Sequence, residues 1–178
     1  MTIRLAVASD AASIASLHAR SWQTAYRGIL STEFLEGPVI ANRLQLWQER
    51  FSETAPHNQY ILVSEHESAV QGFACAYLDA DREWGTLLDN LHVEPRYQGR
   101  GLGAQLMAMV AQKIRRDGLK PTMHLWVYEQ NDEARRFYER LSGTPADRVA
   151  ESGPDGGRVN AVRYVWRQLE VLALCGRG

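Results

Sequence analysis

Cysteine, net charge and long apolar runs are all scarce in this chain of 178 residues. Cys75 and Cys175 are too few for a disulfide framework or a zinc site, and the opening MTIRLAVASD lacks a signal-peptide core. The formal net charge is −1 and the basic residues are dispersed, which argues against a nucleic-acid partner. No apolar run is long enough to span a bilayer. We therefore expect a cytoplasmic protein that binds neither nucleic acid nor membrane.

Length and composition bound the number of domains. Hydrophobic residues make up 45% of the chain, which is enough to build one sizeable core. The same length is short for two such cores. We therefore expect residues 1–178 to form a single domain.

The first part of the chain predicts one strand and three helices. Residues 3–7 read as a short strand, and Ser9 or Asp10 can cap the helix that follows. Ser31 can cap a short second helix, and Pro38 suits the first turn of a third. The packed side of this third helix is expected to carry Ile40, Leu44, Trp47 and Phe51.

The rest of the chain is rich in strands. The predicted elements are an antiparallel hairpin of residues 60–64 and 69–78, a strand ending near Val93, a helix from Leu102, a strand over 123–128, a helix beginning at Asn131, and a final hairpin of 144–150 and 158–169. A strand, a helix and a strand in succession imply a parallel pair with a right-handed crossover. The sequence therefore predicts an α/β fold with a central mixed sheet flanked by helices.

One glycine-rich turn lies at the centre of this arrangement. Pro95 closes the strand that ends near Val93, and the residues from Arg96 to Gly103 lead directly into a helix. The first amides of a helix have no intrahelical partner and carry positive partial charge, and glycines let a ligand approach them closely. Arg96 and Arg100 add fixed positive charge. The turn is therefore a candidate phosphate site, with a merely structural helix start as the alternative.

Two phosphate-binding families are compatible with this turn. Gly99, Gly101 and Ala104 satisfy the dinucleotide fingerprint of Rossmann folds, and Glu129 lies about where a ribose-binding acid is expected. In that pattern, however, the first glycine directly follows the strand, whereas residues 94–98 intervene here. Too few βαβ units remain downstream for a doubly wound sheet.

A second family matches better. Gln98, Gly101 and Gly103, following Leu91 and Val93, resemble the acyl-coenzyme A signature of the GNAT superfamily of N-acetyltransferases. A second stretch resembles the other GNAT signature at the usual distance and carries Asn131, Ala134, Phe137, Tyr138 and Gly143. Together the two signatures cover roughly residues 84 to 143. The resemblance is to bacterial small-molecule members in particular.

The resemblance implies that the parallel strands splay apart and that acetyl-coenzyme A, with no metal, fills the gap. The pantetheine arm would pair with the main chain of Leu91 and Val93, and an N–H near Leu91 or His92 would polarise the acetyl carbonyl. The thioester would lie near Asn131 and Tyr138. The diphosphate would lie on the turn and the start of the helix, with binding residues Gln98, Gly99, Arg100, Gly101, Leu102, Gly103 and Ala104.

The chemistry requires an acid and a base. Tyr138 is the candidate acid that protonates the leaving thiolate, and Asn131 is a candidate site residue as well as a helix cap. The base is left open between Asp89, His92, Glu129 and an ordered water chain. Asp89 and His92 are expected on opposite faces of their strand, so at most one would address the acceptor. No cysteine lies near Tyr138 in the sequence, which favours direct transfer.

The acceptor is expected to be a primary amine of a small molecule or peptide. Trp22, Tyr26 and Arg27 are candidate acceptor-binding residues, because a helix runs into a loop at this point, although both aromatic residues could equally belong to the core. The resemblance also makes a homodimer through the final hairpin possible. The alternatives are a non-catalytic acyl-coenzyme A sensor or interaction module and, less favoured, a Rossmann-type enzyme.

Overall fold

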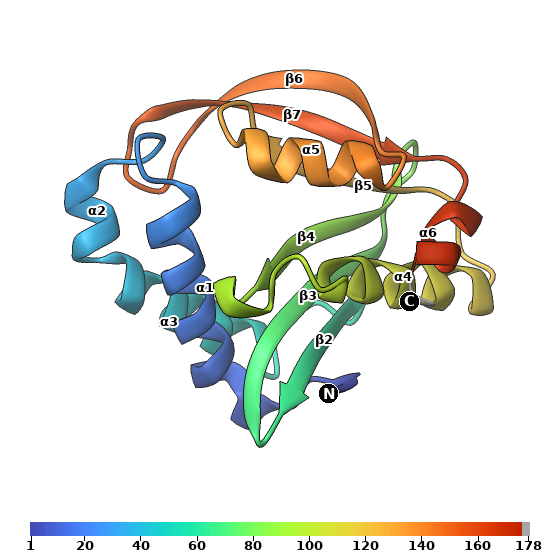
Figure 1. Cartoon of the computed structure of the whole chain (residues 1–178), viewed down its shortest axis with the longest axis horizontal. Helices are drawn as coiled ribbons and strands as arrows, with labels where there is room; N and C mark the ends of the chain where they lie inside the picture. The colour runs from blue at the N-terminus through green and yellow to red at the C-terminus, as the bar shows by residue number, and fades with distance from the viewer. Residues whose placement is uncertain (176–178) are drawn as a thin grey trace.

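The protein is described by a computed structural model that covers residues 1–175, with side chains as far as residue 172. Within that range one mixed sheet has the strand order β1-β2-β3-β4-β5-β7-β6 (Figure 1). The strands are β1 (Thr2–Leu5), β2 (Gln59–His66), β3 (Ala69–Asp81), β4 (Gly85–Val93), β5 (Met123–Tyr128), β6 (Thr144–Ser152) and β7 (Arg158–Trp166). The predicted mixed α/β fold is confirmed.

Helices flank both faces of the sheet. They are η1 (Ala8–Asp10), α1 (Ala11–Ala25), α2 (Thr32–Glu36), α3 (Val39–Arg50), η2 (Pro95–Tyr97), α4 (Leu102–Arg116), α5 (Asp132–Arg140) and α6 (Glu170–Cys175). None of these helices is long and apolar enough to cross a bilayer.

Successive side chains of β3 pack into two different halves of the core. Phe73 and Cys75 face the cluster that α1 and α3 build, whereas Ala74 and Ala76 face the cluster that includes α4 and α5. Figure 1 shows α1 and α3 on one side of β3 and β4 and α4 on the other. The sheet is therefore buried on both faces at its centre, where β4 runs.

The single parallel strand pair among the described strands is β4 with β5, and it is short. The two strands pair only at Thr86 with Met123 and at Leu87 with His124. Beyond Leu87, β4 continues to Val93 along β3, while β5 continues along β7. The predicted splay of the parallel strands is thus present. A doubly wound Rossmann sheet is excluded for this part of the chain, because the other strand pairs are antiparallel.

Several predicted boundaries need correction. The first strand ends at Leu5 instead of residue 7, and β7 ends at Trp166 instead of Leu169. The short helix α6 follows β7 and was not predicted. The other strands and helices begin and end within a few residues of the predicted positions, as helix and strand ends do between assignment methods.

The packed face of α3 was predicted correctly for Trp47 and Phe51 and wrongly for Ile40 and Leu44. Ile40 and Leu44 are 58% and 37% exposed, whereas Val39, Arg43 and Trp47 are buried at a spacing of four residues. The helix is therefore rotated relative to the prediction, and it directs an arginine inward. This rotation matters for the site described below.

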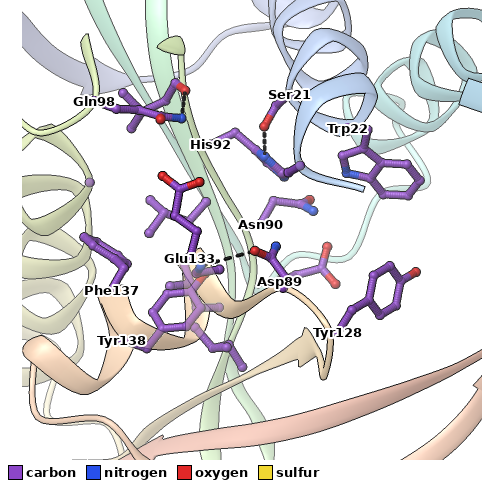
Figure 2. Close-up of a pocket in the computed structure, with 18 of the residues that line it drawn as sticks. Ser21, Trp22, Asp89, Asn90, His92, Gln98, Tyr128, Glu133, Phe137 and Tyr138 are labelled. Carbon is purple, nitrogen blue, oxygen red and sulfur yellow. Dashed lines mark hydrogen bonds between the residues drawn. The ribbon is translucent and has the colours of Figure 1, made fainter. Parts of the chain in front are cut away.

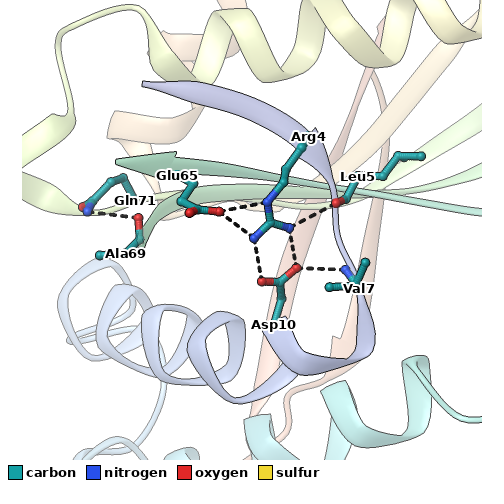
Figure 3. Close-up of polar contacts among 7 residues, drawn as sticks. All are labelled: Arg4, Leu5, Val7, Asp10, Glu65, Ala69 and Gln71. Atoms are coloured by element: carbon teal, nitrogen blue, oxygen red, sulfur yellow. Dashed lines mark hydrogen bonds and ion pairs between the residues drawn. The ribbon is translucent and has the colours of Figure 1, made fainter. Parts of the chain in front are cut away.

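Asp10 does not cap α1 with its side chain, contrary to the prediction. Its carboxylate instead accepts hydrogen bonds from both Nη atoms of Arg4, at 2.7 and 2.9 Å, and from the amide of Val7 at 2.8 Å (Figure 3). Arg4 also donates to Glu65 of β2 at 2.8 Å. The side chain of Arg4 thus links the start of α1 to β2 of the sheet.

Candidate active site

A cavity of about 720 Å³ opens where β4 and β5 diverge. One end meets the glycine-rich turn before α4, and the other meets α1 and α3, with α5 along one side (Figure 2). The sequence-predicted residues that line it are Trp22, Tyr26, Asp89, Leu91, His92, Val93, Gln98, Gly99, Gly101, Leu102, Gly103, Asn131 and Tyr138.

Three predicted residues lie elsewhere. Arg100 is exposed and places its Cζ 5.5 Å from the ring of Tyr97. Ala104 is 8% exposed and packs in the core on α4. Arg27 lines a smaller neighbouring cavity that shares Ser21, Gln98 and Asn131 with the main one.

The turn before α4 presents its main chain openly. Gly99 and Gly101 have φ angles of +71° and +79°, and a Cβ at either position would have no neighbour within 4 Å. This left-handed backbone strains residues that carry a side chain. Gly103 is different, because a Cβ there would lie 3.1 Å from Cζ of Phe137. Two glycines therefore shape an open helix start, and the third accommodates α5.

Gln98 closes the turn back onto the strand. Its Nε2 donates to the carbonyl oxygen of Val93 at 3.1 Å, so the side chain spans the break that Pro95 introduces (Figure 2). This fixes the turn against the end of β4. The strand's main chain from Leu88 onward has no pairing with β5.

Asn131 and Tyr138 come from the start and the last turn of α5. The side chain of Asn131 accepts a hydrogen bond from the amide of Ala134 at 3.2 Å, which confirms it as the N-cap. Tyr138 is 9% exposed and lines the cavity, and its ring packs against Tyr164 and Trp166. Burial raises the pKa of Tyr138 above its ordinary value, so the phenol keeps its proton at neutral pH.

The side chains of Asp89 and His92 point to the same face of the sheet, whereas opposite faces were predicted. Cys75 pairs with Asn90 and Ala76 with Leu88, so Asp89 is the extra residue of a β-bulge. The bulge shifts the alternation of side chains by one position. Asp89 consequently reaches Arg50 of α3. His92 reaches Ser21 of α1 (Figure 2).

His92 is a weak proton acceptor here. Its Nδ1 lies 2.8 Å from Oγ of Ser21, and its ring centroid lies 4.5 Å from that of the fully buried His18. Burial, and then the charge of Arg43, lower the pKa of His92 to about 3. The imidazole is therefore neutral at pH 7.

Glu129 faces away from the cavity lining. Its carboxylate forms an ion pair with Arg148 at 3.2 Å and accepts from Nδ2 of Asn160 at 3.3 Å. Both partners belong to the last hairpin, β6 and β7. Of the three candidate side chains, Asp89 and His92 line the cavity and Glu129 does not.

The end of the cavity that meets α1 and α3 contains two arginines that sequence reasoning missed. The guanidinium of Arg43 lies 4.0 Å above the ring of Trp22, and Arg50 pairs with Asp89 at 2.5 Å and also donates to Asn90. Both arginines line the cavity. The available signal was their spacing on α3, because positions 43, 47 and 50 share a helical face.

Aromatic rings complete this end of the cavity. The rings of Trp22 and Tyr26 lie 5.1 Å apart edge to face, and those of Tyr26 and Tyr128 lie 4.9 Å apart. Trp22 is also part of a buried cluster with Phe34 of α2. Trp22 therefore belongs to the core and also lines the cavity.

The sheet, the cavity and the helix start together define an acyltransferase fold, and comparison with known proteins agrees. The model of the acetyltransferase (GNAT) family matches residues 18–143. The chain belongs to this family and is an N-acetyltransferase.

Two relatives with assigned activities are similar to the chain. The 5-NmdU N-acetyltransferase of Pseudomonas phage PaMx11 is 37% identical over 100 residues, which are 56% of this chain and 68% of the phage protein. The L-methionine sulfoximine/L-methionine sulfone acetyltransferase of Salmonella typhimurium is 27% identical over 175 residues, which are 96% of this chain and 95% of that protein.

Solved structures show the same fold. The PaiA N-acetyltransferase of Thermoplasma acidophilum, solved in complex with coenzyme A, superposes with a TM-score of 0.67 at 19% identity. The match covers 91% of this chain and 96% of the other.

Proposed function

We propose that this chain transfers the acetyl group of acetyl-coenzyme A directly to the primary amine of a small molecule or peptide. The observation that carries the proposal is the fork between β4 and β5, whose pairing stops at Leu87. The cavity begins at the N-terminus of α4, where main-chain amides are accessible. It extends along the fork to an end lined by charged and aromatic side chains of α1 and α3. A long ligand with an anionic tail and a reactive tip fits such a path.

The glycine turn supports binding of the diphosphate. The first amides of α4 have no intrahelical partner, and the open space beside Gly99 and Gly101 lets an anion approach them. Arg96 and Arg100 lie near the turn, stacked on Tyr97 at 5.1 and 5.5 Å. Their charges would act on the anion from the exposed rim, without a contact in the cavity.

The unpaired edge of β4 supports binding of the pantetheine arm. Between Leu88 and Val93 this edge offers main-chain groups that β5 does not use, so an extended amide chain can pair there as an added strand. The carbonyl of Val93 already accepts from Gln98, which leaves one of its lone pairs for a ligand. Successive amides of a strand point to opposite edges, so the amide of Leu91 or that of His92, but not both, is proposed to stabilise the acetyl oxygen.

Acetyl-coenzyme A would supply an activated thioester, and Tyr138 would supply the proton for the departing sulfur. Burial raises the pKa of the phenol, so it is protonated at neutral pH and the proton that the sulfur needs is present. Its hydroxyl makes no hydrogen bond with another residue in the described part of the chain, so it can donate to a ligand. Asn131, at the start of the same helix, orients α5 as its N-cap.

Asp89 is proposed to hold the amine of the acceptor. Its carboxylate lines the cavity, and the ion pair with Arg50 fixes its orientation. The neutral His92 can accept a hydrogen bond but is too weak a base to take the proton of an ammonium ion. The amine proton is therefore assigned to Asp89 or to water that it contacts.

Direct transfer is proposed because the nearest thiol in the core is unsuitable. Cys75 is fully buried, and burial raises its pKa to about 12. A thiol in that state does not form an acyl-enzyme readily. We also propose a cytosolic location, where acetyl-coenzyme A is available and Cys75 stays reduced, and leave pairing of two copies through β6 and β7 as an expectation.

The experiment that tests this function measures free thiol release from acetyl-coenzyme A with a panel of small amines. Amine-dependent release with acetylated product seen by mass spectrometry is the expected result. Tight binding of coenzyme A without release for any amine would identify a sensor instead. Thermal protection by NADH but not by coenzyme A would favour a dinucleotide enzyme.

A further inference from the structure

Arg43 carries a buried charge and has no carboxylate partner among the residues that the structure describes. The residue is 9% exposed and lies on the buried face of α3, between Val39 and Trp47. Its hydrogen bonds go to the neutral side chain of Asn42, with Nε at 3.0 Å from Oδ1. Its remaining contact is the ring of Trp22 at 4.0 Å. Neither contact neutralises the guanidinium.

The other arginine of the cavity differs in this respect. Arg50 pairs with Asp89 at 2.5 Å, so this end holds two inward cations and one inward carboxylate. Asp89 is itself exposed, as are the other charged residues that line the cavity, and exposed charges are screened by water. The others are Glu133, Glu151 and Arg140. The buried part of the acceptor end therefore has an excess positive charge at Arg43.

An unpaired buried cation is unfavourable unless a ligand compensates for it. Burial, and then the charge of Arg50, lower the pKa of Arg43 to about 10, which still leaves it charged at pH 7. Nε and Nη2 both donate to Asn42, so the N–H groups of Nη1 and the second N–H of Nη2 are the parallel pair left to match a carboxylate. The diphosphate of acetyl-coenzyme A is proposed to bind at the opposite, glycine-rich end of the cavity. It therefore does not neutralise the charge of Arg43.

Building on the proposed function, we propose that Arg43 binds a carboxylate of the acceptor, and that the acceptor is a small amine bearing a carboxylate, such as an amino acid. Asp89 would hold the ammonium group while Arg43 holds the carboxylate. Trp22, Tyr26 and Tyr128 would contact the acceptor's apolar part. The paired Asp89 and the unpaired Arg43 thus give the site opposite charges for a zwitterion.

The first test uses the unaltered protein and three forms of each acceptor. An L-amino acid, its primary amide and its decarboxylated amine are compared by thiol release at saturating acetyl-coenzyme A. The amide has a less basic amine than the acid and the decarboxylated compound a more basic one, so basicity alone cannot favour the acid over both. We expect kcat/KM to be roughly 100-fold higher for the acid, the size of a charge-assisted hydrogen bond.

The second test removes the charge and keeps the length of the side chain. Arg43→Met should raise KM for the acid by roughly 30-fold or more and leave kcat/KM for the amide within about twofold. Arg116→Met is the matched control, because Arg116 is 71% exposed in its side chain and pairs with Asp117 on the far end of α4. The control should behave as the unaltered protein.

The outcomes separate this inference from the function on which it rests. Amides or decarboxylated amines used as well as the acids, with turnover intact, overturn the carboxylate role alone. No release with any compound overturns the proposed function and this inference with it. If Arg43→Met does not fold, Arg43→Lys is measured: retained preference for the acid, weakened by the loss of the planar fork, supports the proposal, and equal use of acid and amide overturns it.

Discussion

The two ends of the cavity are built in different ways. The glycine-rich end is made of consecutive residues, and its proposed function depends on main-chain amides that a turn exposes. The acceptor end is made of side chains from α1, α3, β4 and β5, which are far apart in the sequence. The first end can be conserved as a short pattern, whereas the second can change one residue at a time without affecting the first.

The largest expected effect is at Tyr138, which belongs to neither end. Tyr138→Phe removes the hydroxyl and keeps the ring that packs on Tyr164 and Trp166. We expect kcat to fall by roughly 100-fold or more, as for loss of a general acid, while the affinity for coenzyme A changes little. Steady-state kinetics and calorimetry measure the two. Unchanged kcat would remove Tyr138 from the chemistry.

A smaller effect is expected from changing the glycine-rich end. Gly101→Glu places a carboxylate and a side chain where the diphosphate is proposed to approach, and should raise the Kd for coenzyme A by roughly 30-fold or more. Gly118→Glu is the control, because Gly118 also has a positive φ and open space but follows the other end of α4. Equal loss of affinity in both variants would rule out the proposed cradle.

Gly103 is not suited to this experiment. A Cβ at that position meets Phe137, so a large substitution would disturb α5 as well as any ligand. Loss of binding in such a variant would have two explanations.

Trp22→Phe, at the proposed acceptor end, should change the KM for the acceptor instead of the Kd for coenzyme A. A smaller ring weakens the stack beneath Arg43, so KM for the acceptor should rise by about threefold to fivefold while the Kd for coenzyme A stays constant. Trp84→Phe is the matched control, since Trp84 also lies beneath an arginine, Arg163, at 4.6 Å and does not line the cavity. A change in coenzyme A affinity would mean that the two ends are coupled.

Substitution of Asp10 should lower the stability of the fold without changing binding at either end of the cavity. Its pKa is lowered by hydrogen bonds from Arg4, so the stabilisation is present above the ordinary pKa near 3.9 and is lost as the pH falls through the folded value. Asp10→Asn should cost about 1 kcal/mol at pH 7, since Arg4 is partly exposed, and the difference should shrink below about pH 4. Urea unfolding at pH 7 and pH 3 measures both values.

The sequence was most informative where the main chain sets the structure. Pro95, the glycines of the turn and the cap at Asn131 act locally, so the strand, turn and helices around them could be predicted from neighbouring residues. The parallel pairing of β4 and β5 followed from element order alone.

Prediction failed where a side chain acts at long range. Counting apolar residues alone placed Ile40 and Leu44 in the core, because the spacing of Arg43 with Trp47 does not reveal that Trp22 of another helix covers its guanidinium. The bulge at Asp89 was missed for a similar reason, since it is defined only against the partner strand β3. Asp10 was assigned to its own helix because Glu65 and Arg4 belong to other elements.

The short pairing of β4 with β5 has a consequence for hydrogen exchange. Amides on the open edge beyond Leu87 should exchange with solvent faster than those bonded to β3, because exchange requires no separation of strands there. A molecule that pairs with this edge would slow them selectively and raise the melting temperature with its concentration. Those amides of residues 88–93 that face the open edge can therefore report ligand occupancy without any assay of turnover.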